Sequence, residues 1–175
     1  MEALIFFLFP LFFYLALKIA IWRDVDTTDL DIKKYQEGIR MIEFGFIEEA
    51  LVYFDKMATI HTKSMVVFAK RAHCHFLLQN YYQAIYNYDK AQSLSHDLPE
   101  VFLHKGICLY KIGDVELAYK EFNKAVWFYR EKNAEAFQWR ATTSEWLGNK
   151  EAAQKDFKKA DLLRKMPATV IKKLK

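Results

Sequence analysis

Small and aromatic residues recur at a fixed spacing along residues 31–165. One series contains Ala50, Ala84, Ala118 and Ala153, which are separated by steps of 34, 34 and 35 residues. The same steps separate four further sets: Gly38, Ala72, Gly106 and Ala141; Gly45, Gln79, Gly113 and Gly148; Phe54, Tyr88, Phe122 and Phe157; and Met57, Ala91, Ala125 and Ala160. Internal similarity at such a period indicates a stack of similar structural units.

Each unit is predicted to contain two helices joined by a tight turn. In the third unit these helices cover residues 102–112 and 115–128, and Gly113 supplies the left-handed conformation that ends the first one. Gly106 and Ala118 let the two helices approach closely, while Phe122 fills the gap between units. Because one hairpin cannot bury its apolar face alone, we expect the stacked units to share one continuous core.

This pattern resembles the tetratricopeptide repeat (TPR) family, whose signature is W-x2-L-G-x2-Y followed by A-x3-F, A and P. Units two and three carry the matching residues: Phe68, Ala72, His75, Ala84, Tyr88 and Ala91, and Phe102, Gly106, Leu109, Ala118, Phe122 and Ala125. The resemblance implies an all-α fold, an α-solenoid of four TPR-like helix hairpins over residues 31–64, 65–98, 99–133 and 134–165. The chain departs from the family in lacking the proline that ends units one to three, and residues 166–175 are too few for a full-length capping helix.

A continuous apolar run precedes the repeats. Residues 3–22 read ALIFFLFPLFFYLALKIAIW, with Lys18 as the single charge, and as a helix they reach ~30 Å, the thickness of the hydrocarbon core. Phe6 and Phe12 lie within this run, and Trp22 and Arg23 suit the membrane interface. The sequence therefore predicts a transmembrane anchor over residues 1–23 and a juxtamembrane linker over 24–30. The alternatives are a cleaved signal peptide, against which the segment lacks a basic start and a cleavage site, and a buried core helix.

Basic residues lie at the C-terminal end of the predicted span or after it: Lys18, Arg23, Lys33, Lys34 and Arg40. The positive-inside rule then predicts a single-pass membrane protein with its N-terminus outside and its TPR body in the cytoplasm. Cys74 and Cys108 cannot make a disulfide framework, which agrees with a reducing compartment.

The composition and charge of the chain limit the classes of partner that it is expected to bind. The 175 residues carry a net charge of +4, which does not favour nucleic acid, and 53% hydrophobic residues exclude wholesale disorder. From Lys150 onward the chain has nine basic and three acidic residues, a net charge of +6. This stretch ends in a basic tail over residues 166–175, which contains Lys172, Lys173 and Lys175. This stretch is either a contact for anionic lipid or an acidic partner, or a solvated helix face.

In the TPR family the first helix of each unit lines a concave groove. The repeat register places twelve residues there: Tyr35, Ile39, Ile42, Ala69, His73, Phe76, Leu103, Ile107, Tyr110, Gln138, Thr142 and Trp146. The set is apolar and aromatic, so the resemblance implies a groove for an apolar peptide or a neighbouring helix. The alternative is that these side chains pack on the linker or on one another. The positions of a carboxylate clamp for chaperone tails do not hold the required residues.

No catalytic motif is present. The chain lacks a nucleophile–base pair, a phosphate loop and a paired-carboxylate signature. His73, Cys74 and His75 point ~100° apart on a helix, so they cannot share a metal ion, and the two cysteines are expected to be small buried residues. We therefore predict no catalytic residue, no metal and no cofactor. Trp127 and Tyr129 fall on repeat positions that are normally polar. They either form an interface patch or pack against the chain where the one extra residue between units three and four shifts the repeat register.

The sequence thus predicts a membrane-anchored TPR scaffold, or an accessory subunit of a membrane complex, that binds a partner protein through an apolar concave groove without catalysis. One alternative is a membrane receptor for amphipathic targeting peptides. Another is a regulator of an envelope or membrane enzyme, similar to the bacterial inner-membrane TPR protein that controls lipopolysaccharide synthesis. Neither nucleic acid nor a small-molecule substrate is expected.

Overall fold

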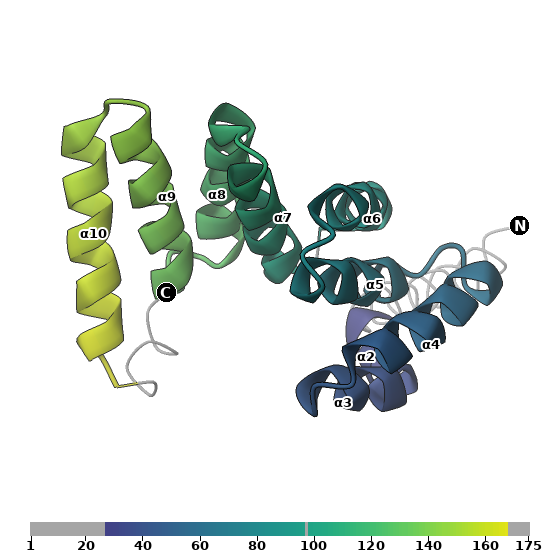
Figure 1. Ribbon diagram of the computed structural model, residues 1–175. Coiled ribbons are helices and arrows are strands. Elements are labelled where there is room, and N and C mark those ends of the chain that lie inside the picture. Colours follow the sequence, from purple (N-terminus) through teal and green to yellow (C-terminus); the bar gives the residue numbers. More distant parts are fainter. Residues whose placement is uncertain (1–26, 97, 168–175) are drawn as a thin grey trace, which may run out of the picture. The chain divides into compact units, whose positions relative to one another are not determined.

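The computed structural model describes residues 27–96 and 98–167, and within them the regular structure is helical throughout (Figure 1). The helices are α2 (Thr27–Lys34), α3 (Gln36–Glu43), α4 (Ile47–Ile60), α5 (Met65–Leu77), α6 (Tyr81–Leu94), α7 (Pro99–Lys111), α8 (Val115–Phe128), α9 (Ala134–Trp146) and α10 (Lys150–Lys165). The chain falls into two compact units, residues 1–34 and 35–175, and α2 is the described helix of the first.

The second unit is a series of helix hairpins. Helices α3, α5, α7 and α9, here called helices A, pair with α4, α6, α8 and α10, called helices B. Each helix B also packs on the next helix A, and α7 contacts both α5 and α9 (Figure 1). The predicted all-α array of repeated hairpins is therefore confirmed. In unit three the second helix has the predicted bounds, whereas the first begins three residues early because Pro99 suits the first turn of a helix.

One backbone conformation ends every helix A. Gly45, Gln79, Gly113 and Gly148 have φ angles of 85°, 59°, 91° and 83°, so the series found in the sequence marks four left-handed turns. In unit three the N–H of Gly113 donates to the carbonyl of Tyr110 at 3.1 Å, and that of Asp114 donates to Leu109 at 2.9 Å. This is the Schellman motif, which satisfies the last carbonyls of the helix and turns the chain into helix B.

Side-chain caps define several helix starts. The side-chain oxygens of Ser64, Asp114, Asn133 and Asn149 each accept a hydrogen bond from the backbone N–H three residues on. These caps satisfy N–H groups that have no partner inside the helix, so they fix where α5, α8, α9 and α10 begin.

The small residues of the repeat lie where helices touch. A Cβ atom added at Gly106 would lie 2.6 Å from Cε1 of Phe122, which is closer than real atoms approach. Ala118 is fully buried on the facing helix B. The sequence series therefore records a steric requirement, because larger residues would push helix A away from helix B.

The extra residue between units three and four lies in the α8–α9 connection. Arg130 and Glu131 both adopt left-handed φ angles, 51° and 56°, which are uncommon for residues with side chains. The N–H of Glu131 donates to the carbonyl of Val126 at 3.0 Å, so the end of α8 forms its own turn before Asn133 starts α9.

The predictions of a membrane anchor and a basic tail concern residues outside those described. Phe6, Phe12, Lys18, Trp22 and Arg23 belong to the predicted span, and Lys172, Lys173 and Lys175 belong to the predicted tail. Within residues 27–96 and 98–167, no helix combines the length and the apolar character that crossing a bilayer requires.

Candidate functional site

The predicted groove residues differ in how far they are buried. Tyr35 is buried and its ring lies 5.7 Å from that of His61, while Leu103 and Ile107 are buried in the core around α7 and α8. These three side chains therefore pack against the protein's own residues, which is the alternative to lining an open groove. Ile39 and Ile42 of α3 are half-buried.

His73 and Phe76 of α5 meet α7 in an aromatic cluster. The His73 ring lies 4.7 Å from the ring of His104 and 5.8 Å from that of Phe76, and Phe76 lies 5.2 Å from His104. Beside the cluster, Lys70 Nζ donates to Oε1 of Glu100 at 2.8 Å. The helix A surface of units two and three therefore contains a histidine pair flanked by one ion pair.

Burial keeps these histidines neutral. It lowers the pKa of His73 to about 4, with a further contribution from nearby His104, and it also lowers the pKa of His104. Burial alone would raise the pKa of Glu100, but the Lys70 ammonium leaves that pKa below its ordinary value. The cluster thus has a charged edge and an uncharged interior at neutral pH.

The predicted residues of units three and four reach further into solvent. Tyr110 is half-buried against the core and its ring meets Trp139 edge to face at 5.5 Å. Trp146, the last residue of α9, is 70% exposed. At the adjoining position in unit one, Phe44 is 75% exposed. Large apolar side chains therefore stand in solvent at the turn ends of helices A, at both ends of the array.

Cys74 and Cys108 are buried, as expected from the sequence. Burial raises the pKa of each thiol to about 12, so both remain protonated and unreactive at neutral pH. Over the described residues, no three His, Cys, Asp or Glu side chains come together as a metal site.

A cation on helix A ties each unit to the one before it. Arg71 Nε of α5 donates to Oδ1 of Asp55 on α4 at 2.6 Å, and Arg71 Nη1 donates to Oδ1 of Asn87 on α6 at 3.2 Å. The Asn87 amide donates to the carbonyl of Gln83 at 2.8 Å, which leaves its oxygen directed at Arg71. One guanidinium therefore links the helices B of two consecutive units.

The next joint repeats this arrangement with other residues. Lys105 Nζ of α7 lies 2.5 Å from Asp89 of the preceding unit and 3.4 Å from Glu121 of its own unit. Gln92 of α6 contributes a further contact, because its Nε2 donates to Glu121 at 2.9 Å.

At the third joint Arg140 of α9 replaces Lys105. Its Nη1 donates to Asn123 of the preceding unit at 3.2 Å, and its Nε and Nη2 hold both oxygens of Asp156 at 2.6 and 2.8 Å. The hydrogen bond to Asp156 raises the pKa of the guanidinium. The two-pronged contact ties α9 to α10 within unit four, and the hydrogen bond to Asn123 links the guanidinium to unit three.

We call Arg71, Lys105 and Arg140 the joint cations. The small and aromatic series in the sequence do not include these residues, although they are separated by 34 and 35 residues like the other series. They stand where the TPR signature has leucine, so a search for apolar matches passes over them. The signal that reveals them is the matching series Asp55, Asp89 and Asn123 on the preceding helices B.

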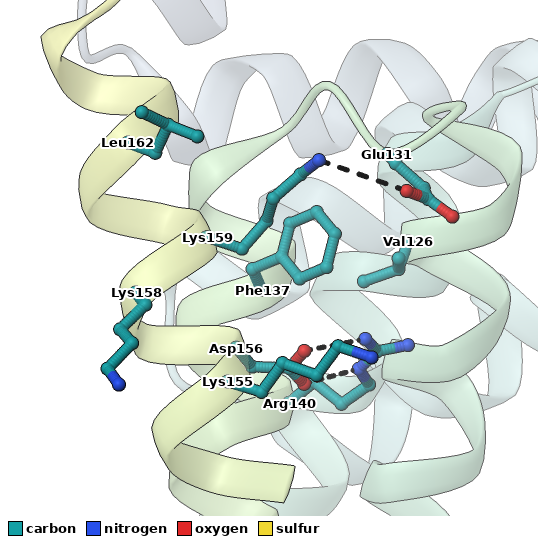
Figure 2. A pocket seen from close by; sticks show the side chains of 9 residues that line it. All are labelled: Val126, Glu131, Phe137, Arg140, Lys155, Asp156, Lys158, Lys159 and Leu162. Carbon is teal, nitrogen blue, oxygen red and sulfur yellow. Dashed lines mark hydrogen bonds and ion pairs between the residues drawn. The ribbon is translucent and has the colours of Figure 1, made fainter.

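A cavity of about 370 Å³ lies beside the third joint, between α8, α9 and α10 (Figure 2). Phe137 and Val126 form its apolar wall, and the pair of Arg140 and Asp156 stands at one end. Its remaining lining residues are Glu131, Lys155, Lys158, Lys159 and Leu162. Lysines outnumber unpaired carboxylates here, so the cavity suits an apolar group with an attached anion rather than a cation.

Trp127 is an exposed aromatic side chain beside the α8–α9 connection. It is 71% exposed and meets Phe128 edge to face at 4.6 Å. Phe128 in turn stacks on Phe102 at 4.6 Å with the rings 4° apart, and His96 stacks against both. The sequence left Trp127 open between surface and packing, and the structure places it on the surface, upon a rigid aromatic stack. Tyr129 is half-buried, and burial raises its pKa.

No protein-family model and no curated protein sequence matches the chain. Solved structures of MamA share its fold. One crystal structure of MamA is 19% identical, covers 84% of each chain and has a TM-score of 0.68. A second is 18% identical over 89% of this chain and 80% of that one, also with a TM-score of 0.68. MamA of Desulfovibrio magneticus RS-1 is 16% identical over 74% and 73% of the two chains, with a TM-score of 0.67. These similarities establish a TPR-like all-helical fold.

Proposed function

We propose that this chain is a protein-interaction scaffold that holds a partner protein at a membrane. A TPR-like array of stacked helix hairpins suits a protein partner. The predicted anchor over residues 1–23 and the basic residues that follow it support a membrane location with the array in the cytoplasm. The function needs no catalysis and no cofactor.

The observation that carries the proposal is the exposure of large apolar side chains at the turn ends of helices A. Phe44 and Trp146 are largely exposed, and Leu77 and Leu147 stand at the matching positions of units two and four with exposed side chains. Leu77 and Trp146 share one repeat position, and Phe44 and Leu147 share the next one. Isolated exposed apolar residues are ordinary, but exposed apolar side chains at two adjoining repeat positions are typical of an interaction surface. We call Phe44, Leu77, Trp146 and Leu147 the apolar rim.

The partner segment that fits the apolar rim is an apolar or amphipathic helix. Tryptophan is enriched among residues that dominate binding energy, because it buries a large rigid surface. The half-buried Phe76 lies one position before Leu77, and the half-buried Tyr110 occupies the same repeat position in unit three. Both extend the apolar surface along helices A. Such a surface matches the recognition of a helix by spaced apolar anchors.

Site-specific photo-cross-linking in cells tests this function. A photoreactive amino acid at position 146 should cross-link to one partner protein, which mass spectrometry can identify. The matched control carries the same group at Lys120, an exposed position of α8 away from the rim. Equal cross-linking from both positions, or none from position 146, contradicts the proposal. Saturable competition by short amphipathic peptides would identify a receptor for targeting segments instead.

A further inference from the structure

The interior joints follow one rule. A polar acceptor on helix B of one unit, Asp55, Asp89 or Asn123, meets the joint cation on helix A of the next unit, Arg71, Lys105 or Arg140. Both sets are spaced by the repeat, so each residue occupies the same place in its own unit. The acceptor faces forward along the array and the cation faces backward.

At the two ends of the array the charges at these positions are reversed: a cation occupies the acceptor position and a carboxylate occupies the cation position. Lys158 of α10 stands where Asp55, Asp89 and Asn123 stand, 35 residues after Asn123. Glu37 of α3 stands where the joint cations stand, 34 residues before Arg71. Both side chains are exposed, and Lys158 stands at the border of the cavity beside the third joint. The forward end therefore offers a cation and the backward end a carboxylate.

A second pair of positions is also complementary. Across the second joint, Gln92 donates to Glu121 at 2.9 Å. The equivalent forward residue of unit four is Asp161, and the equivalent backward residue of unit one is Tyr53. Burial, followed by the charge of Glu37, raises the pKa of Tyr53, so its hydroxyl stays protonated and can donate to a carboxylate. Asp161 has Arg164 of its own helix at 3.7 Å and keeps accepting capacity.

The forward face of α10 also carries an incompletely covered aromatic ring. Phe54, Tyr88 and Phe122 are buried between units, and Trp139 of the next helix A stacks on Phe122 at 5.9 Å. Phe157 occupies the same repeat position but is half-buried, because within the described residues no helix A follows α10. A ring of this kind gains most from a following unit.

We propose that the forward face of α10 binds the backward face of α3 and α4 of a second copy of this chain, with Lys158 paired to Glu37. The contact repeats the interior joint with its charges reversed, so neither end can pair with a copy of itself. Because the two faces differ, every contact leaves one free face at each end, and copies can add in a line. The membrane scaffold would then present its apolar rim many times over.

Charge reversal tests the proposal on the full chain, purified in mild detergent and followed by sedimentation velocity over a concentration series. Glu37→Lys alone and Lys158→Glu alone each place like charges opposite one another, and each should weaken self-association about tenfold. An equal mixture of the two variants should restore it, because position 158 of each then meets an opposite charge at position 37 of the other. Circular dichroism confirms that the exposed substitutions leave the helices intact.

The matched control variants are Glu116→Lys and Lys120→Glu, which make the same charge changes on the exposed face of α8. They should associate like the unmodified chain. Single variants at positions 37 and 158 that associate normally, or a mixture that stays as weak as its parts, overturn the proposal. So does a full chain that is monomeric throughout while a chain ending at Pro167 associates, because its own last residues then occupy the face of α10.

Discussion

At the scale of single residues, the structure shows positions held for geometric reasons and others held for their charge. Gln79 occupies a left-handed turn that glycine fills in the other three units. His73 is half-buried, its buried Nδ1 has no hydrogen-bond partner among the described residues, and the ring stays neutral. The side chain of Asp156, which pairs with Arg140, is 8% exposed, whereas that of Asp55, which pairs with Arg71, is 47% exposed. These differences in burial decide which substitutions matter.

Gln79→Gly should stabilise the array. A left-handed φ strains a residue with a Cβ atom but not glycine, and the relief is about 1 kcal/mol. The measurement is the free energy of unfolding from urea titration. Gly113→Gln, at the matching turn of unit three, is the control and should destabilise the array by a similar amount. A less stable Gln79→Gly variant contradicts the account of the turn.

Stability should fall as pH drops from about 6.5 toward 4. The unfolded chain binds a proton on His73 near its ordinary pKa of 6.5, while the folded chain does so only near 4, so protonation favours unfolding across this window. Urea titrations at pH 7 and pH 5.5 measure the effect before the carboxylates begin to protonate. His73→Gln should have a smaller difference between the two pH values. An unchanged difference would show that His73 is not buried as described.

Asp156→Ala should destabilise unit four by about 2 kcal/mol, because it leaves the half-buried Arg140 with Asn123 alone. Asp55→Ala, which removes an exposed partner of Arg71, should have an effect below 1 kcal/mol. Both are measured as changes in the free energy of unfolding. Equal effects would mean that the exposure of the carboxylate does not decide how much each ion pair contributes to stability.

At the scale of helices, the repeat spacing predicts the hairpins because close packing requires small residues at fixed places. The positions of Gly106 and Ala118 follow from sequence alone, since no larger residue fits there. The burial of Leu103 and Ile107 could not be predicted in the same way. Both are apolar helix A residues, and only the packing of neighbouring helices decides whether they face a partner or the core. The role of the joint cations is hard to predict from sequence because their partners on the preceding helices B vary between carboxylate and amide.

Ala118→Arg should disrupt unit three and its contacts with unit four. It forces a charge into the contact of α7 with α8, a penalty of several kcal/mol. Circular dichroism of the full chain should show a large loss of helix. Leu117→Arg, one residue earlier at an exposed position, serves as the control and should keep the helical signal. Retained helix in Ala118→Arg would mean that the repeat register is misplaced.

At the scale of the molecule, we propose that three different surfaces bind three different partners. The apolar rim binds a partner, the end faces bind further copies, and the predicted anchor and basic tail bind the membrane. Lys175→Cys tests the orientation: in intact cells a membrane-impermeant reagent should leave it unlabelled, and permeabilisation should expose it. Cys74 and Cys108 do not interfere because both are buried. Labelling of intact cells would place the array on the outer side.

We propose above all that the apolar rim holds the partner protein. The most direct measurement is the amount of partner that co-purifies with the full chain in mild detergent, compared between two multiple variants. Phe44→Ser with Trp146→Ser should release most of the partner while the helical signal stays unchanged, because both side chains are exposed. Replacing Lys172, Lys173 and Lys175 with glutamine should retain the partner and alter only the salt sensitivity of membrane contact. Release by the lysine variant and retention by the rim variant would contradict the account.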